Sequence, residues 1–160
     1  MRIEIHAVGR LKAGPERELA MRYLDRLAKA GPQLGLDFGG VSEHAEARAA
    51  NAAARKREEA QKLATRLPQG AALIALDEGG RTMDSVSFAH MLAAMRDEGR
   101  AAAAFVIGGP DGLDSSLLDS AERRIAFGAM TWPHRIVRIL LTEQLYRAVT
   151  ILSGHPYHRA

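Results

Sequence analysis

The sequence predicts an α/β fold in which a mostly parallel sheet is flanked by helices. From residue 70 onward, short apolar runs alternate with amphipathic segments in the order strand, helix, strand, helix, strand, helix. This alternation is typical of parallel sheets covered by helices. Glycine-rich turns follow the apolar runs, as expected where parallel strands end. The length of 160 residues suits one domain, residues 1–160, with its own hydrophobic core.

The first half of the chain predicts two strands and two helices. Residues 2–9, RIEIHAVG, alternate in polarity like a strand, and residues 14–31 form an amphipathic helix that ends at a glycine. A short strand follows over residues 34–41. Residues 42–68 are rich in Ala, Glu, Lys and Arg, which predicts a long helix that stops before a proline.

The alternation that defines the fold class begins after this helix. Residues 71–80, AALIALDEGG, predict a buried strand that meets a glycine turn. Residues 85–99 predict an amphipathic helix, and residues 101–113, AAAAFVIGGPDGL, a second strand and glycine turn. Residues 115–125 predict a short helix, and residues 126–134 a last strand that leads into a loop.

A final helix is predicted over residues 135–153, and its apolar side chains cover more than one face. Either this helix is central to the domain, or its second face meets another chain. The apolar residues are Ile136, Val137, Ile139, Leu140, Leu141, Leu145, Val149, Ile151 and Leu152.

Composition narrows the classes of protein. The 47% hydrophobic and 26% charged fractions are those of an ordinary globular domain. Cysteine is absent, which excludes disulfides and thiolate metal sites and suits a cytoplasmic location. No apolar run approaches the roughly 18–20 residues that cross a bilayer, so no membrane partner is expected. The net charge of +3, carried mainly by arginine, permits an RNA partner without requiring one.

Three predicted strand ends carry unusual residues, at positions 76–80, 107–113 and 127–134. Ligands of open α/β sheets bind beyond the carboxyl ends of the strands, so one ligand can touch all three. The GPDG sequence is also explained as a simple tight turn, and the third segment as a buried strand that ends at a proline. The P-loop and G-x-G-x-x-G patterns are absent, which argues against an NTPase or a nicotinamide enzyme.

The chain closes on the tail SGHPYHRA, which follows the final helix. Gly154 suits a helix C-cap and Pro156 prevents continuation, so the tail leaves the helix in a defined direction. Glu143 and Arg147 follow helical spacing toward it. They are also explained as an ordinary intrahelical ion pair.

Three motifs together resemble those of the ribosomal large-subunit methyltransferase H family of the SPOUT superfamily: FVIGGPDGL, TWPHRIVRILLTEQLYRA and HPYHR. The resemblance implies a trefoil-knotted α/β fold, a homodimer and S-adenosylmethionine as methyl donor. It also implies methylation at N3 of a pseudouridine in 23S rRNA, on the assembled ribosome.

Carried over residue by residue, the resemblance places the methyl donor at the three strand ends. Gly108 would leave room for the donor, and a Gly108→Val side chain would block it without disturbing the fold. Backbone groups of the third loop would contact adenine and ribose. The residues are Leu76, Gly108, Phe127, Gly128, Ala129, Met130, Thr131 and Trp132.

The acceptor side is expected in the tail. N3 of pseudouridine must lose a proton, and His155 and His158 are both candidates for the general base. Arg147 and Arg159 are candidates to stabilise the anion, with Glu143 beside Arg147. Tyr157 is a candidate to stack on the target base.

Two other functions are alternatives to methyl transfer. A silent RNA-binding module suits the charge but does not explain the three glycine-rich strand ends. A hydrolase lacks a recognisable nucleophile. Binding of S-adenosylmethionine distinguishes methyl transfer from both. A zinc site at HPYH lacks ligands, so no metal is expected.

Overall fold

The computed structural model describes residues 1–158. In this range, five strands form one sheet in the order β2-β1-β4-β3-β5, and every pairing is parallel. The predicted fold class is confirmed. The strands are β1 (Arg2–Val8), β2 (Asp37–His44), β3 (Ala72–Arg81), β4 (Ala102–Ile107) and β5 (Arg123–Ile125).

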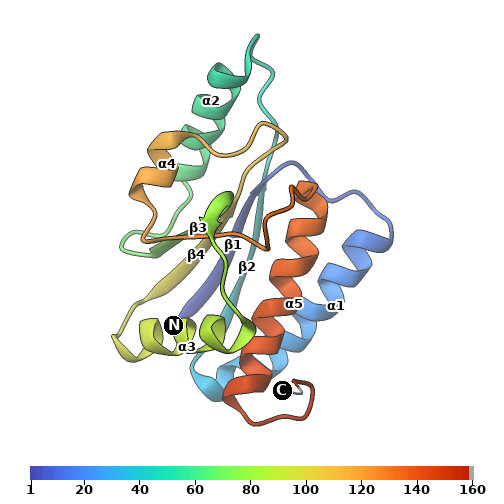
Figure 1. Cartoon of the computed structure of the whole chain (residues 1–160), viewed down its shortest axis with the longest axis vertical. Helices are drawn as coiled ribbons and strands as arrows, with labels where there is room; N and C mark the ends of the chain where they lie inside the picture. The colour runs from blue at the N-terminus through green and yellow to red at the C-terminus, as the bar shows by residue number, and fades with distance from the viewer. Residues whose placement is uncertain (159–160) are drawn as a thin grey trace.

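Helices cover both faces of the sheet (Figure 1). On one face, α5 lies between α1 and α3, and the smaller pair of α2 and α4 covers the other face. The helices are α1 (Pro15–Ala30), α2 (Ala52–Ala64), α3 (Ser85–Asp97), α4 (Ser115–Ser120) and α5 (His134–Leu152), with a 3-10 turn at Gly31–Leu34.

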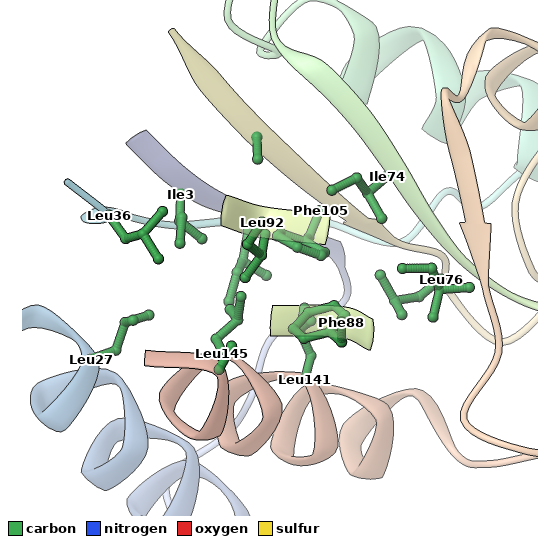
Figure 2. Close-up of a cluster of buried hydrophobic side chains, with 14 of the residues drawn as sticks. Ile3, Leu27, Leu36, Ile74, Leu76, Phe88, Leu92, Phe105, Leu141 and Leu145 are labelled. Carbon is green, nitrogen blue, oxygen red and sulfur yellow. The ribbon is translucent and has the colours of Figure 1, made fainter. Parts of the chain in front are cut away.

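The larger core lies between the sheet and the layer of α1, α3 and α5. Alternate strand residues such as Ile3, Ile74 and Phe105 point into this layer, where Leu141 and Leu145 of α5 meet them (Figure 2). All five side chains are fully buried. Part of the wide apolar surface of α5 is therefore explained by its central position in the domain.

The helix predicted over residues 42–68 is wrong in its first part. β2 continues to His44, because its backbone pairs with β1 as far as Val8. The helix begins only at Ala52, where the Asn51 side chain accepts from the Ala54 amide at 2.8 Å and caps it. Pairing within the sheet outweighed the helical propensity of this segment.

The last strand also differs from the prediction. Residues 126–134 were expected to hold it, but residues 126–133 form a loop. The strand is β5, inside the segment predicted as helix 115–125, and α4 ends at Ser120. β5 has three residues and is defined by pairing with β3, where Ile125 lies opposite Leu76. A strand this short leaves no periodic pattern in the sequence.

Two expectations are not tested by this architecture. The trefoil knot and the single-domain organisation stay predictions. Within the described part of the chain, no helix is long and apolar enough to cross a membrane.

Candidate active site

The ends of β3 and β4 and the loop before α5 enclose a cavity of about 770 Å³ at the carboxyl edge of the sheet. This volume lies within the roughly 300–1,000 Å³ of small-molecule sites. The predicted donor residues line the cavity, with the exception of Ala129: they are Leu76, Gly108, Phe127, Gly128, Met130, Thr131 and Trp132.

The GPDG segment after β4 is the tight turn that its sequence predicts. The Gly112 amide donates to the Gly109 carbonyl at 3.0 Å, and Gly112 takes a φ of 83°. Arg55 of α2 holds the turn, since its Nε and Nη2 donate to the two oxygens of Asp111 at 2.7 and 3.0 Å. This hydrogen bonding holds the pKa of Asp111 below its ordinary value. The same loop thus forms the tight turn and lines the cavity.

The expectation that Gly108→Val leaves the fold intact is wrong. A Cβ atom at this position would lie 2.7 Å from the carbonyl carbon of Gly112 and 2.9 Å from the amide of Leu113. These are backbone atoms of the same loop, so Gly108→Val would displace the loop before meeting any ligand. Gly108 is required by the packing of the loop on itself.

The loop before α5 is fastened to the end of β3. The Thr131 hydroxyl donates to Glu78 at 2.8 Å, and the indole Nε1 of Trp132 donates to the Phe127 carbonyl at 3.2 Å. Met130 and Trp132 remain exposed, at 73% and 42%. An apolar pair of side chains therefore stands at the rim of the cavity.

Carboxylates dominate the polar lining of the cavity. Asp77, Glu78 and Asp111 face it, with Lys56 as the one Lys or Arg among the lining residues. His134 also lines the cavity, and burial, with a smaller contribution from the charge of Arg138, lowers its pKa. An acidic cavity next to a neutral imidazole suits a cationic ligand.

The tail begins at a well-formed helix stop. The His155 amide donates to the Thr150 carbonyl at 2.9 Å and the Gly154 amide to the Ile151 carbonyl at 3.2 Å, while Gly154 takes a φ of 68°. These two bonds define a Schellman motif. They confirm the C-cap predicted at Gly154.

Beyond this stop the tail folds back on α5. The Tyr157 hydroxyl donates to Glu143 at 3.0 Å, and its ring lies 4.9 Å from that of Tyr146. The Arg147 guanidinium lies over the Tyr157 ring at 4.9 Å. Burial, together with hydrogen bonds to Tyr23 and Glu143, raises the pKa of Tyr157, so the phenol stays protonated.

Glu143 is the acceptor at the centre of this tail network. Arg147 Nε donates to it at 2.9 Å and Gln144 donates to its other oxygen at 2.7 Å, in addition to the bond from Tyr157. The predicted ion pair of Glu143 and Arg147 is therefore present, within a larger cluster. Glu143 therefore holds the tail network together.

The two tail histidines occupy different settings. The Nδ1 atom of His158 lies 3.4 Å from Arg147 Nη1, and because a guanidinium only donates, Nδ1 is the acceptor. His155 is exposed, and its Nδ1 accepts from the Tyr157 amide at 3.1 Å. Arg159 lies outside the described residues.

The cavity lies at the first residue of α5 and the tail network near the last turns of this helix. Figure 1 shows the course of α5 and of the tail that follows it. His134 lines the cavity and Arg147 belongs to the network, and thirteen residues of helix separate them by about 20 Å. The structure thus brings Glu143, Arg147, Tyr157 and His158 together. It does not bring them to the donor residues of the same chain.

Sequence reasoning missed several polar residues of the cavity. Asp77 and Glu78 stand inside the LDEGG segment, in the second half of β3, so their position toward the carboxyl end of a strand is a usable signal. The pairing of Arg55 with Asp111 joins residues 56 positions apart, and no local pattern indicates it.

Comparison with known proteins places this geometry in a family. A family model described as "Predicted SPOUT methyltransferase" matches residues 1–158. The chain belongs to the SPOUT methyltransferase family. Two relatives share 59% identity with it, each named ribosomal RNA large subunit methyltransferase H. The relative from Rhizobium leguminosarum bv. trifolii aligns over 99% of both chains, and the one from Sinorhizobium medicae over 100% of both.

One solved structure was also compared, a probable methyltransferase from Bordetella pertussis Tohama I. It matches with a TM-score of 0.48 and 16% identity, over 92% of this chain and 95% of that chain. That likeness is too low to add to the family assignment.

SPOUT methyltransferases use S-adenosylmethionine as methyl donor. The cavity fits this molecule in size and charge, because its carboxylates complement a sulfonium and an ammonium group. Asp77 and Glu78 would face these cations, since Asp111 is paired with Arg55, and the apolar walls at Leu76 and Phe127 would receive the adenosine. When bound, the donor supplies an electrophilic methyl group on a cationic sulfur.

Proposed function

We propose that this SPOUT protein methylates N3 of a pseudouridine in 23S rRNA, on the assembled ribosome in the cytoplasm. The observation that carries the RNA target is the 59% identity, over 99% of both chains, to a relative named for large-subunit ribosomal RNA. The acidic cavity beyond β3 and β4 supports the donor half of the reaction. The atom N3 and the pseudouridine follow from the family resemblance of the three sequence motifs.

The catalytic unit in this proposal is a homodimer. A single chain holds its donor cavity and its tail network about 20 Å apart, so neither can serve the other. Ile136 and Leu140 are half-buried on α5 without joining the core, which leaves an apolar ridge beside Glu143 and Arg147. A second copy packed on this ridge by two-fold symmetry would complete the site.

The register of such a pair follows from the helix itself. In an antiparallel pair of α5 helices centred on Leu140, residue 134 lies opposite residue 146 of the partner helix. The loop just before α5 lines the donor cavity, so the partner's Arg147 and His158 would reach its mouth. Each dimer would then hold two sites, each built from both chains.

Methylation at N3 requires residues that stabilise the anion of the target base. N3 lies between two carbonyl groups, and loss of its proton spreads negative charge onto both oxygens. Arg147 and the Nε2–H of His158, whose Nδ1 accepts from Arg147, are donors suited to that charge. The N3 proton would pass to solvent water, and N3 would take the methyl group supplied by the donor in line, with S-adenosylhomocysteine as the leaving group. Tyr157 and Glu143 act as positioning residues that hold Arg147.

The test is methyl transfer to ribosomes that lack the modification. Radiolabelled methyl from S-adenosylmethionine should enter 23S rRNA, and mass analysis of the nucleosides should place it on N3 of one pseudouridine. Free 23S rRNA should be a poorer substrate than the ribosome. A protein that binds S-adenosylmethionine in calorimetry but methylates neither RNA would contradict the proposal.

A further inference from the structure

A second cavity, of about 800 Å³, opens between α1, α5 and the edge of the sheet at β1 and β2. It shares no lining residue with the donor cavity. Its floor is apolar and is formed by Ile5, Leu24, Phe38 and Val41. Its mouth is formed by the loop after β1 and the first turns of α1.

Three exposed cations stand at this mouth, Arg10 and Lys12 on the loop and Arg17 on α1. Within residues 1–158, no ion pair engages any of them. Of the two acids in the lining, Glu43 is already neutralised by Arg138 Nη1 at 2.6 Å, which leaves Asp25. The cavity therefore carries a net positive charge over an apolar floor.

The loop that carries Arg10 and Lys12 is held in place by hydrogen bonds to Arg138 and Glu43. Arg138 is 3% exposed, and its Nη2 donates to the Val8 carbonyl at 3.0 Å and to the Gly9 carbonyl. The Leu11 amide donates to Glu43 at 2.9 Å. Because the loop is fixed by buried hydrogen bonds, its cations are positioned before any ligand arrives.

The second cavity lies next to the donor cavity, since both open at the carboxyl ends of the parallel strands. His134 lines the first and Arg138 the second, one turn or about 6 Å apart on α5. Arg138 and Thr142 point away from Ile136 and Leu140, since two positions turn a helix by about 200°. The cavity thus stays open in a dimer packed on the apolar ridge.

We propose that the second cavity binds an unpaired nucleotide of the RNA substrate, a neighbour of the one that is methylated. An unstacked base suits an apolar floor, and its phosphates suit Arg10, Lys12 and Arg17. The inference rests on the proposed function, because that function makes RNA the substrate. It adds an anchoring site that places the target base at the donor cavity.

The test compares a double variant, Lys12→Ala with Arg17→Ala, with the matched control Arg123→Ala. Arg123 is an exposed cation on β5, at the opposite edge of the sheet. The first readout is co-sedimentation with ribosomes that lack the modification, which is independent of catalysis. The double variant should bind about ten-fold more weakly, and its salt dependence should fall by about 1.4 to 1.8 in log–log slope. Its affinity for S-adenosylmethionine should not change, and its kcat/KM for methyl transfer to ribosomes should fall in step with the weaker binding.

A filling variant separates the cavity from its charge. Val41 is 41% exposed on the floor, so Val41→Lys adds a cation while it occupies the space for a base. Binding should weaken as in the double variant. Stronger binding by Val41→Lys, an unchanged double variant, or an equal loss in Arg123→Ala would each overturn the inference. So would dissociation into monomers in light scattering, since the cavity would then be an interface between copies.

The two proposals fail in different ways. Ribosome binding that depends on this cavity without methyl transfer would refute the proposed function alone. A kcat/KM for methyl transfer that is indifferent to these variants would refute the anchoring site alone.

Discussion

At the scale of single residues, the tail network is organised around Arg147. It is paired with Glu143, stacked on Tyr157 and in contact with His158, so its position depends on residues from both α5 and the tail. A planar guanidinium satisfies these contacts together, whereas an ammonium group cannot. We expect catalysis to depend on the planar geometry of the Arg147 guanidinium and not on its charge alone.

Arg147→Lys should therefore lower kcat by about 100-fold, the scale of losing a donor to a developing anion. Calorimetry should show unchanged S-adenosylmethionine binding, because Arg147 is not among the residues that line the donor cavity and would act on the acceptor base. Arg26→Lys is the control, since Arg26 also lies over an aromatic ring, that of Tyr146 at 5.6 Å. Turnover in that control should stay within about two-fold. Equal losses in both variants would contradict the role given to Arg147.

A second residue-scale prediction concerns pH. Burial lowers the pKa of His134 below its ordinary 6.5, so the unfolded chain takes up its proton at a higher pH than the folded chain. The stabilisation that neutral His134 contributes is complete above about pH 6.5. It is lost as the pH falls from there toward the lower pKa of the folded state. His44 acts in the same direction, and Glu59, whose pKa is raised by burial, in the opposite one.

His134→Gln isolates the contribution of His134. The variant should lose less free energy of unfolding than the wild type between about pH 7 and 5, in urea titrations at each pH. Identical pH profiles for the two proteins would show that His134 titrates normally in the folded state.

At the scale of elements, the end of α5 decides where the tail goes. Gly154→Ala has space for its Cβ but forces a left-handed conformation on alanine, at a cost of about 1 kcal/mol. Gly99 closes α3 with the same pair of hydrogen bonds, a φ of 79° and equal free space, so Gly99→Ala is a matched control. Thermal unfolding should show similar losses in both variants. Methyl transfer should fall only in Gly154→Ala, and equal activities would mean that the tail has no catalytic role.

At the scale of the whole molecule, the question is whether one chain's tail serves another chain's cavity. Asp77→Arg should disable the donor cavity and Arg147→Ala the tail, each abolishing methyl transfer alone. When the two proteins are unfolded together and refolded as a mixture, half of the dimers are mixed and each regains one intact site. About a quarter of wild-type activity should return.

An inactive mixture would show that each tail serves its own chain. Light scattering on the same samples should give about twice the 17.3 kDa chain mass. A monomer at micromolar concentration would contradict the composite site before any assay.

Sequence patterns predicted those parts of the fold that local chemistry controls. α5 was expected over residues 135–153 and spans His134–Leu152, because its apolar periodicity is long and its glycine stop is unambiguous. The three strand ends were expected to share a ligand, since parallel strands end at the same edge. Asp77 and Glu78 fell within the first of these ends, but their role needed the cavity.

The sequence by itself determined the layer architecture, the strand-end cavity and the direction of the tail, because each depends on short-range periodicity, glycine and proline. Tertiary structure alone decided β5 and the late start of α2, which follow from strand pairing between distant segments. It also decided that Gly108 serves its own loop and that Arg138 supports a second cavity. Tertiary structure likewise decided the distance between the donor cavity and the tail network along α5. Distances between residues far apart in the chain are set by packing, which no local pattern encodes.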